Sequence, residues 1–351
     1  MNNIFIQINE LLSKGRSVAL CRIIRQTGSA PRATGVNCLV LDDGSLRGTI
    51  GGGRLEYEVT TKASENFTAG SSFLQHFELT GAEVAQTEKM ICGGIVDVYT
   101  EYFASDNEAA CILFRQISAK LREGKKGVLM TLVGEGPTGN KHGHVFLGED
   151  GIVMGTIPGL VVDEEEKKCR LEMGSAALIE VVGAGRLFVE PVQPDNVLYL
   201  FGAGHISTCL APLAKMIGFT VVVIDDREEF CNSERFPLAD ELLVVPFNEV
   251  FERIVVSAAS YLVILTRGHI FDHTVLQSAL WYSSAYIGMI GSRRKIDILY
   301  RSLLAEGVSQ ASLQKVYAPV GLPIGAESPE EIAICIAAEL IQVRAGLRKN
   351  L

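Results

Sequence analysis

Two glycine-rich segments of the sequence have the residue types and spacing of anion-binding loops. In the first, Gly51, Gly52 and Gly53 are followed by Arg54 and by apolar residues at a spacing of four, which predicts that the loop opens a helix. Backbone N–H groups of such a loop can surround an anion. Consecutive glycines lose much conformational entropy when they are ordered, so their presence needs a reason. The alternative to anion binding is a steric one, a place where two backbone segments cross closely.

The second segment matches the pattern G-x-G-x-x-G, except that Ser207 takes the last position. Gly202 and Gly204 lie between a predicted strand and a predicted helix, and His205 follows where a pyrophosphate would pass. Asp225 comes 23 residues after Gly202 (225 minus 202), at the end of the next predicted strand, where a carboxylate can accept a ribose hydroxyl. The pattern predicts nucleotide binding; the alternative is a tight turn kept for packing alone.

Further polar residues follow neighbouring predicted strands. Asp226, His269 and Asp272 come directly after apolar runs. Because the carboxyl ends of parallel strands meet at one edge of a sheet, we expect them to converge with His205 and Asp225 in a cleft. This cleft could also bind a metal ion. Its ligand spacing is not diagnostic, however, and the alternative is exposed loop histidines with ordinary hydrogen bonds.

Two more segments could bind a ligand. Ser292 and Arg293 lie in a loop that follows a predicted strand and offers backbone donors and two guanidinium groups to an anion; the alternative is a helix N-terminus whose arginines pair with surface acids. Cys92 precedes Gly93 in a predicted turn between strands. A thiol in this setting can be reached by a ligand, although a lone cysteine is more often structural.

Composition excludes several classes of protein. The chain has 351 residues, a net charge of −9 and scattered basic residues, which argues against a nucleic-acid partner. The first residues lack a basic leader, and no apolar run reaches the length of a membrane helix, so we expect a cytoplasmic protein. The eight cysteines include no CxxC pair, so neither a zinc site nor a disulfide framework is predicted.

The apolar pattern predicts an α/β protein with two domains. Residues 1–190 read as a mixed α/β domain with short strands, and 191–196, with two prolines, as a linker. Residues 197–351 alternate strands and helices, as in a Rossmann-like, doubly wound parallel sheet. The expected helices include 4–12, 107–122, 206–217 and 329–347, and another between the predicted strands that end near 247 and begin near 261.

Over essentially its full length the sequence resembles the xanthine dehydrogenase accessory factor family of the XdhC/CoxI type. The resemblance rests on the order and spacing of several motifs together. The N-terminal motifs are GSAPRATG, GTIGGG running into Leu55 and Glu56, and Cys92-Gly93-Gly94; the C-terminal motifs are LYLFGAGHIS, VVVIDDR, YIGMIGSRRK and APVGLPIGAESPEEIA.

The resemblance implies a factor that binds the molybdenum cofactor (molybdopterin) as cargo. Such a factor protects it while a cysteine desulfurase installs the terminal sulfido ligand, and delivers it to a xanthine dehydrogenase-like apoenzyme. The implied cofactor-binding residues are Arg32, Gly51, Gly52, Gly53, Arg54, Glu56, Cys92 and Gly93. Many relatives carry cysteine where this sequence has Arg54, so Cys92 acts alone if any thiol takes part.

Two other functions agree with parts of the sequence. The glycines near residue 202 and Asp225 suit an oxidoreductase that uses NAD(P) or FAD, but no Tyr-x-x-x-Lys pair for hydride transfer is found. A scaffold that brings the desulfurase and the apoenzyme together, without binding the pterin, is the third possibility. The apolar content and the many short strands also predict a homodimer.

Overall fold

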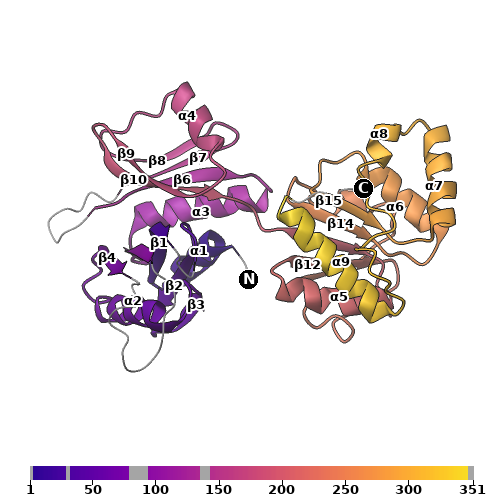
Figure 1. Ribbon diagram of the computed structural model, residues 1–351, viewed down its shortest axis with the longest axis horizontal. Helices are drawn as coiled ribbons and strands as arrows, with labels where there is room; N and C mark the ends of the chain where they lie inside the picture. Colours follow the sequence, from indigo (N-terminus) through magenta and orange to yellow (C-terminus); the bar gives the residue numbers. More distant parts are fainter. Residues whose placement is uncertain (1–2, 29–31, 79–93, 135–142, 347–351) are drawn as a thin grey trace. The chain divides into compact units, whose positions relative to one another are not determined.

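The computed structural model describes residues 3–28, 32–78, 94–134 and 143–346. The chain divides between Gln193 and Pro194 into two compact units (Figure 1). The division falls within residues 191–196, and strand β10 (Gly185–Val192) includes Pro191 and Val192. A proline is tolerated there because β10 pairs with β9 (Ala177–Val181) only as far as Val189.

The N-terminal unit contains two five-stranded antiparallel sheets. The first has the order β3-β2-β1-β5-β4 and the second the order β8-β7-β6-β10-β9. The remaining strands are β1 (Val18–Gly28), β2 (Asn37–Leu41), β3 (Leu46–Gly48), β4 (Phe73–Glu78), β5 (Gly94–Phe103), β6 (Gly127–Leu132), β7 (His144–Gly148) and β8 (Val153–Thr156). The helices are α1 (Ile4–Ser13), α2 (Gly53–Glu65), α3 (Glu108–Arg122) and α4 (Glu164–Leu171).

Helix α2 packs on the first sheet through the face that the sequence predicts. Leu55, Val59 and Ala63 are all buried and share one apolar cluster with Cys21 of β1 and Cys38 of β2. The spacing of four is confirmed as the buried stripe of a helix. The loop that begins this helix is therefore anchored to strands β1 and β2 by a close-packed core.

A buried group of charged side chains joins the two sheets of the N-terminal unit. Arg22 of β1, with no exposed surface, forms ion pairs of 2.5 Å with Glu101 of β5 and Glu190 of β10. His144 of β7 lies 2.9 Å from Glu101. Burial raises the pKa of Glu190, against the opposing effect of the Arg22 charge. Breaking a buried pair by removing one partner leaves the other charge uncompensated, so we expect these contacts to hold the sheets in place.

The C-terminal unit is a five-stranded parallel sheet with the order β13-β12-β11-β14-β15. Helices α5 and α9 cover one face, and α6 and α7 cover the other (Figure 1). This is the doubly wound arrangement that the sequence predicts. The strands are β11 (Val197–Phe201), β12 (Thr220–Asp225), β13 (Glu241–Val244), β14 (Ser260–Ile264) and β15 (Tyr286–Met289). The helices are α5 (His205–Met216), α6 (His269–Ala279), α7 (Arg293–Ala305), α8 (Gln310–Leu313) and α9 (Pro329–Arg344).

The prediction of a helix between β13 and β14 is wrong. That segment contains only the short 3-10 helix η1 (Val250–Glu252). Phe247, Val250, Phe251 and Ile254 pack on the sheet at the spacing of a helical stripe, but the segment forms a short 3-10 helix with flanking turns instead of an α-helix. Every helix of the described ranges is too short or too polar to cross a membrane.

Helix α9 is fixed at both of its ends and in its middle. Ser328 and Glu331 form a capping box at its start, with Pro329 in the first turn. In its middle the buried Glu339 accepts hydrogen bonds from the hydroxyl of Tyr286 at 2.5 Å and from the N–H of Gly321 at 2.9 Å. Near its end Arg344 donates to the carbonyl of Ile217, which follows α5, at 2.7 Å.

We predict that Arg22→Ala destabilises the N-terminal unit by about 3–5 kcal/mol, because it leaves Glu101 and Glu190 as buried, uncompensated charges. Urea unfolding followed by hydrogen exchange and mass spectrometry would assign the loss to peptides of β1, β5 and β10. The matched control is Arg16→Ala, which removes an exposed pair with Asp42 and Asp43 and should change stability little. Equal effects of the two substitutions would contradict the assignment.

Candidate functional site

The first glycine loop, Thr49–Gly53, connects β3 to α2 with its three glycines at positive φ. The angles are 130° at Gly51, 71° at Gly52 and 61° at Gly53. Residues with a Cβ rarely adopt such a run. The triple glycine is therefore required by the backbone path itself, which turns several N–H groups of the loop toward one point.

The carboxylate of Glu56, one turn into α2, lies at that point. Its Oε2 atom accepts hydrogen bonds from the Thr49 hydroxyl at 2.5 Å, the Ile50 N–H at 3.0 Å and the Gly52 N–H at 3.3 Å. Burial raises the pKa of Glu56, but these bonds outweigh it and lower the pKa below its ordinary 4.5. An outside anion would have to displace Glu56 to reach the N–H groups of Ile50 and Gly52.

Two of the other residues predicted to bind the cofactor are exposed arginines. Arg54 is exposed and its Nε donates to the carboxylate of Glu58 on the next turn of α2. Arg32, also exposed, precedes β2. A Cβ added to Gly52 would meet no atom within 4 Å, so there is open space beside the loop. Cys92 and Gly93 lie outside the described residues.

The second glycine loop lies at the centre of the parallel sheet. Gly202 directly follows β11 and has a φ of 109°, and a Cβ built on it would collide with the carbonyl oxygen of Leu265, which follows β14. Gly204 is the N-cap of α5, with open space around it. Ser207, in the place of the third glycine, is buried and donates its hydroxyl to the carbonyl of Gly202. Strands β11 and β14 flank the point where the strand order reverses, which is where ligands bind in folds of this kind.

Asp225 is fully engaged within the protein. Its Oδ1 atom accepts from the N–H and the Nε of Arg227 at 3.1 and 2.9 Å. Its Oδ2 atom accepts from the N–H of Ala203 at 2.8 Å and from Arg227 at 3.1 Å. Burial raises the pKa of Asp225, but Arg227 and the bond from Ala203 lower it overall. Each oxygen already has two donors, so a ribose hydroxyl could bind Asp225 only by displacing one of them.

The neighbouring acid is also paired. Asp226 accepts two hydrogen bonds from Arg267, which follows β14, at 2.5 and 2.8 Å. Arg267 lies 3.7 Å from Asp225 and stacks over the ring of Phe271, and Arg227 stacks over Phe230 in the same manner. Two aspartates and two arginines therefore form one network across the ends of β12 and β14.

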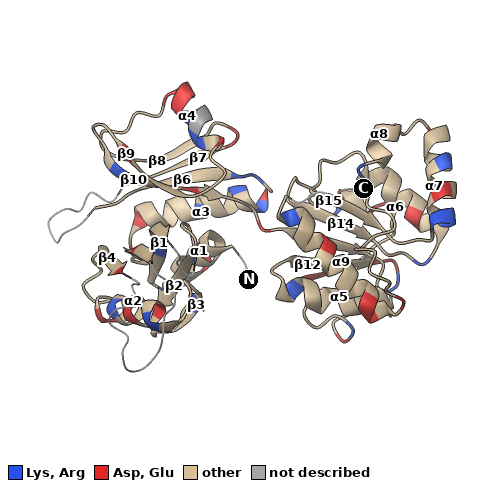
Figure 2. Cartoon of the chain, in the orientation of Figure 1, with Lys and Arg blue, Asp and Glu red and all other residues tan. Residues whose placement is uncertain are grey.

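Asp272 belongs to a second group beneath the same edge of the sheet. It is completely buried in the first turn of α6, accepts a hydrogen bond from the Thr266 hydroxyl at 2.6 Å, and forms an ion pair of 2.5 Å with Lys295 of α7. Ser292 accepts a bond from the Lys295 N–H as the N-cap of α7, and Arg293 beside it is exposed. Helix α7 carries several Lys and Arg residues (Figure 2). The ion pair thus ties the first turns of α6 and α7 together.

The predicted histidines stand at helix starts. His205 and His269 are the first residues of α5 and α6, and both are exposed. Within the part of the chain that the structure describes, no three His, Cys, Asp or Glu residues are grouped so that they could hold a metal ion.

Sequence reasoning missed three residues at this edge: Arg227, Arg267 and Lys295. The pairing of Arg227 with Asp225 could have been predicted, because Arg227 directly follows Asp225 and Asp226 and a cation two residues from an acid can reach back to it. The pairing of Lys295 with Asp272 could not have been predicted from a sequence pattern, because the two residues lie in different helices.

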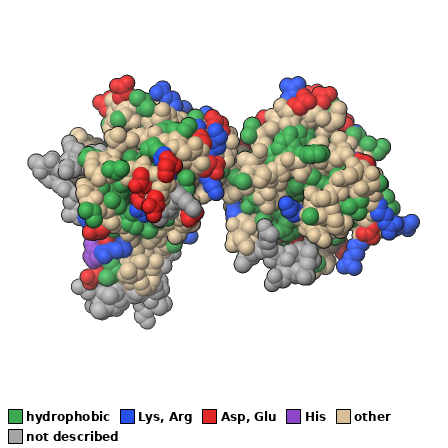
Figure 3. Space-filling model, turned by 90° about the horizontal axis from the view of Figure 1, so that it is seen from above, with side chains coloured by type: hydrophobic (Ala, Val, Ile, Leu, Met, Phe, Trp, Pro, Cys, Tyr) green, Lys and Arg blue, Asp and Glu red, His purple; other side chains and the backbone are tan. Residues whose placement is uncertain are grey.

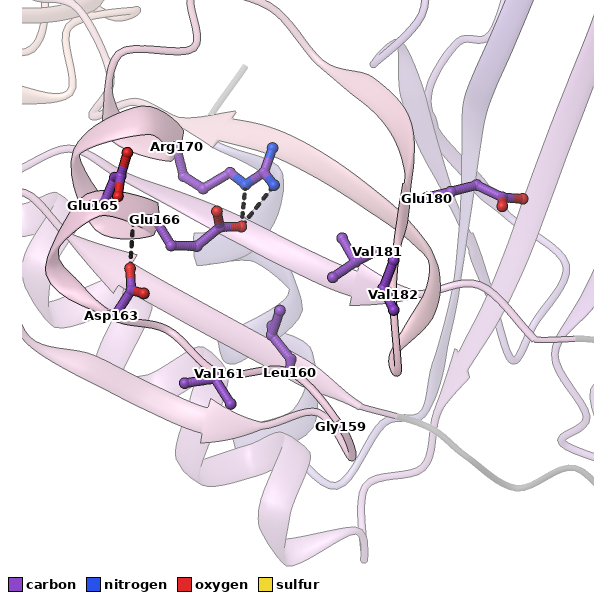
Figure 4. Close-up of a pocket in the computed structure, with 10 residues that line it drawn as sticks. All are labelled: Gly159, Leu160, Val161, Asp163, Glu165, Glu166, Arg170, Glu180, Val181 and Val182. Atoms are coloured by element: carbon purple, nitrogen blue, oxygen red, sulfur yellow. Dashed lines mark hydrogen bonds and ion pairs between the residues drawn. The ribbon is translucent and has the colours of Figure 1, made fainter.

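A pocket of about 550 Å³ opens elsewhere in the N-terminal unit, between α4 and the turn that joins β9 to β10 (Figure 4). Its charged lining is mainly acidic, with Arg170 bound to Glu166 inside it. Two strongly exposed valines, Val161 and Val182, line it as well, and acidic and hydrophobic side chains lie side by side on this face (Figure 3). None of the predicted site residues lines the pocket.

Two models of known protein families match this chain, and each match includes one of the glycine loops. Residues 11–78 match the model described as the XdhC and CoxI family, and residues 198–340 match the XdhC Rossmann domain. The chain belongs to the XdhC and CoxI family. The match to the first model includes Glu56 and the loop it closes, and the match to the second includes the network around Asp225, so both clusters lie in family domains.

Two of the similar proteins extend the similarity over essentially the whole chain, and a third over part of it. A Bacillus subtilis protein named as a probable xanthine dehydrogenase subunit is 27% identical over 345 residues, 98% of each chain. The uncharacterized Escherichia coli protein YqeB is 30% identical over 247 residues, 65% of this chain, which spans 45% of the length of YqeB. A crystal structure described as a xanthine dehydrogenase from Bacillus halodurans covers 100% of this chain, and the match covers 97% of that one, with a TM-score of 0.75 and 26% identity.

We predict that Glu56→Gln lowers the melting temperature at neutral pH, because the charged acceptor of the loop N–H groups is lost. The folded-state pKa of Glu56 is lowered, so its stabilising effect is present above the unfolded value of 4.5 and disappears as the pH falls through the folded value. Melting curves of both proteins between pH 7 and pH 3 should therefore converge at the acid end. Glu58→Gln, on the exposed side of the same helix, is the control; a pH-independent difference for Glu56→Gln would argue against a charge effect.

Gly202→Ala should destabilise the C-terminal unit by about 2 kcal/mol or more, because alanine is strained at a φ of 109° and its Cβ would collide with Leu265. Gly204→Ala, in extended backbone with open space around it, should cost less than about 1 kcal/mol. Hydrogen exchange of peptides from β11 and β14 would measure both. Similar losses of stability for the two variants would mean that the contact with Leu265 is not the reason why position 202 requires glycine.

Proposed function

We propose that this protein is an accessory factor of a xanthine dehydrogenase, which binds the molybdenum cofactor as cargo and assists its sulfuration and insertion into the apoenzyme. Family membership supports an accessory role for xanthine dehydrogenase. The observation that carries the proposal is that both family domains occur in one chain and align along it with a relative named for that enzyme. The chain acts as a carrier rather than as a catalyst.

The exposed side of the first glycine loop is where we place the cargo. The cofactor carries a phosphate and dithiolene sulfurs, so it requires cations and N–H donors. Arg32 and Arg54 are exposed cations, and the space beside Gly52 is open. Charge-assisted hydrogen bonds from guanidinium groups suit a phosphate. Cys92, which follows in the chain, would supply a sulfur ligand, with Gly93 giving it access.

Glu56 has a distinct role in this proposal. Its carboxylate holds the N–H groups of Ile50 and Gly52 in the loop conformation before any cargo arrives. The loop is therefore preorganised, which lowers the entropic cost of binding. A cofactor phosphate either binds outside the closed loop through the arginines or replaces the carboxylate at the same N–H groups.

The proposed partners are a cysteine desulfurase and the xanthine dehydrogenase-like apoenzyme, in the cytoplasm, and the protein itself acts as a homodimer. Binding of NAD(P) or FAD by the C-terminal unit is a separate prediction. The bonds of Asp225 to Arg227 and Ala203 count against the ordinary ribose contact, so we do not propose an oxidoreductase.

The protein, mixed with cofactor released from a molybdoenzyme, should carry molybdenum and pterin fluorescence through gel filtration at a stoichiometric ratio. Arg32→Ala and Arg54→Ala should each weaken binding about tenfold or more, the loss of one charge-assisted hydrogen bond. Cys92→Ser should lower retention of the cofactor.

The control is Cys209→Ser, a half-buried thiol of α5 outside the proposed site, which should retain the cofactor as the wild type does. Absence of molybdenum and pterin from the wild-type protein would reject cofactor binding. Capture of the apoenzyme and desulfurase without cofactor would favour the scaffold instead.

A further inference from the structure

Cys21 and Cys38 lie directly opposite each other on neighbouring strands. The antiparallel register of β1 and β2 pairs the two residues, and both side chains belong to the buried cluster beneath α2. Directly paired residues of antiparallel strands have Cα atoms about 4.5–5.5 Å apart, and a disulfide spans Cα separations of about 4.4–6.8 Å. Both thiols are free in the structure. The pair can therefore be bridged with little movement of the backbone.

The surroundings make the two sulfurs unequal. The Sγ of Cys21 accepts a hydrogen bond from the Thr100 hydroxyl at 3.5 Å. The interaction with Cys38 and the Thr100 hydroxyl lower the pKa of Cys21 against the effect of burial. Because the Thr100 hydroxyl donates to Cys21 and would stabilise a thiolate there, we assign Cys21 as the nucleophile.

We propose that Cys21 and Cys38 form a reversible dithiol–disulfide pair that is oxidised by peroxides. The sulfur of Cys21 attacks one oxygen of hydrogen peroxide; an S–O bond forms, the O–O bond breaks, and the departing hydroxide takes up the thiol proton and leaves as water. The sulfur of Cys38 then attacks that of Cys21; the S–S bond forms, the S–O bond breaks, and the oxygen leaves as water with the proton of Cys38. The two thiols lose two electrons in total, and the peroxide is reduced to two waters.

Access to the pair depends on the edge of the first sheet. Both thiols are buried, with no exposed surface, but β2 is covered on its outer side only by the three-residue strand β3, whose Leu46 and Arg47 are exposed. A brief opening of this short edge strand admits a molecule the size of hydrogen peroxide more readily than a bulky alkylating reagent.

The bridge would form directly below the first glycine loop. Cys38 pairs with Gly48, the last residue of β3, and shares its apolar cluster with Ile50 and Leu55, which belong to the loop and to α2. Oxidation therefore fixes the strand that leads into the loop. The chemistry of the pair is independent of the cofactor function proposed above.

The test is peptide mapping of the full-length wild-type protein after treatment with hydrogen peroxide. Free thiols are blocked by alkylation, and trypsin then releases residues 17–22, which contain Cys21, and residues 33–47, which contain Cys38; each peptide has one cysteine. We expect the two peptides joined, two hydrogens lighter than their sum, and separated again by dithiothreitol. Recovery of both peptides alkylated, under conditions that oxidise half-buried Cys209, would overturn the proposal, as would bridges from either residue to another cysteine.

Two variants test the order of the steps. Cys38→Ala should leave Cys21 as a sulfenic acid that dimedone traps, whereas Cys21→Ala should leave Cys38 as an unmodified thiol. Cys209→Ala is the matched control and should form the 21–38 bridge at the wild-type rate. Trapping at Cys38 rather than Cys21 would reverse the assigned roles, and the wild-type map tests the bridge itself even if a variant fails to fold.

Discussion

Strand β1 is buried on both faces, and its two faces carry opposite kinds of contact. Side chains alternate along a strand, so Cys21 points to the apolar core under α2 while Arg22 points to the second sheet. Arg22 must be desolvated to lie there, and the carboxylates of Glu101 and Glu190, with a hydrogen bond to the Thr131 hydroxyl, offset that cost. Strand β1 positions β2, α2 and the glycine loop. Strand β2 pairs with β1, α2 packs on both strands, and the loop leads into α2.

Both glycine loops hold a carboxylate of the protein's own. Glu56 accepts the N–H groups of Ile50 and Gly52 in one, and Asp225 accepts the N–H of Ala203 in the other. The two loops belong to different folds, yet each uses an internal acid where an anion or a ribose would be expected from sequence. The first loop is held in shape by a side chain of the helix that it opens, and the second by a side chain at the end of the neighbouring strand β12. These loops are thus held in shape without a ligand, which agrees with the carrier role proposed above.

Much of the fold could be predicted because repeating apolar patterns report which side of an element is buried. The spacing of Leu55, Val59 and Ala63 gave the buried face of α2, and the alternation after residue 197 gave the parallel sheet. The pattern failed around Phe251, where apolar residues at a helical spacing lie in a short 3-10 helix and its flanking turns. Pairing could not be predicted: Arg22 lies 79 residues from Glu101 and 168 from Glu190, and only the folded chain brings them together.

Helix α9 sets the order in which the chain can fold during synthesis. Everything that the N-terminal unit needs has been made by Gln193, before any strand of the parallel sheet exists. The parallel sheet, by contrast, lacks half of the helical cover on one face until residues 329–344 have been made, because α9 packs there beside α5. Until then the apolar side chains on that face of β11 and β12 remain partly uncovered. The core of the C-terminal unit is therefore completed only by the last helix to be synthesised, while the N-terminal unit can fold first.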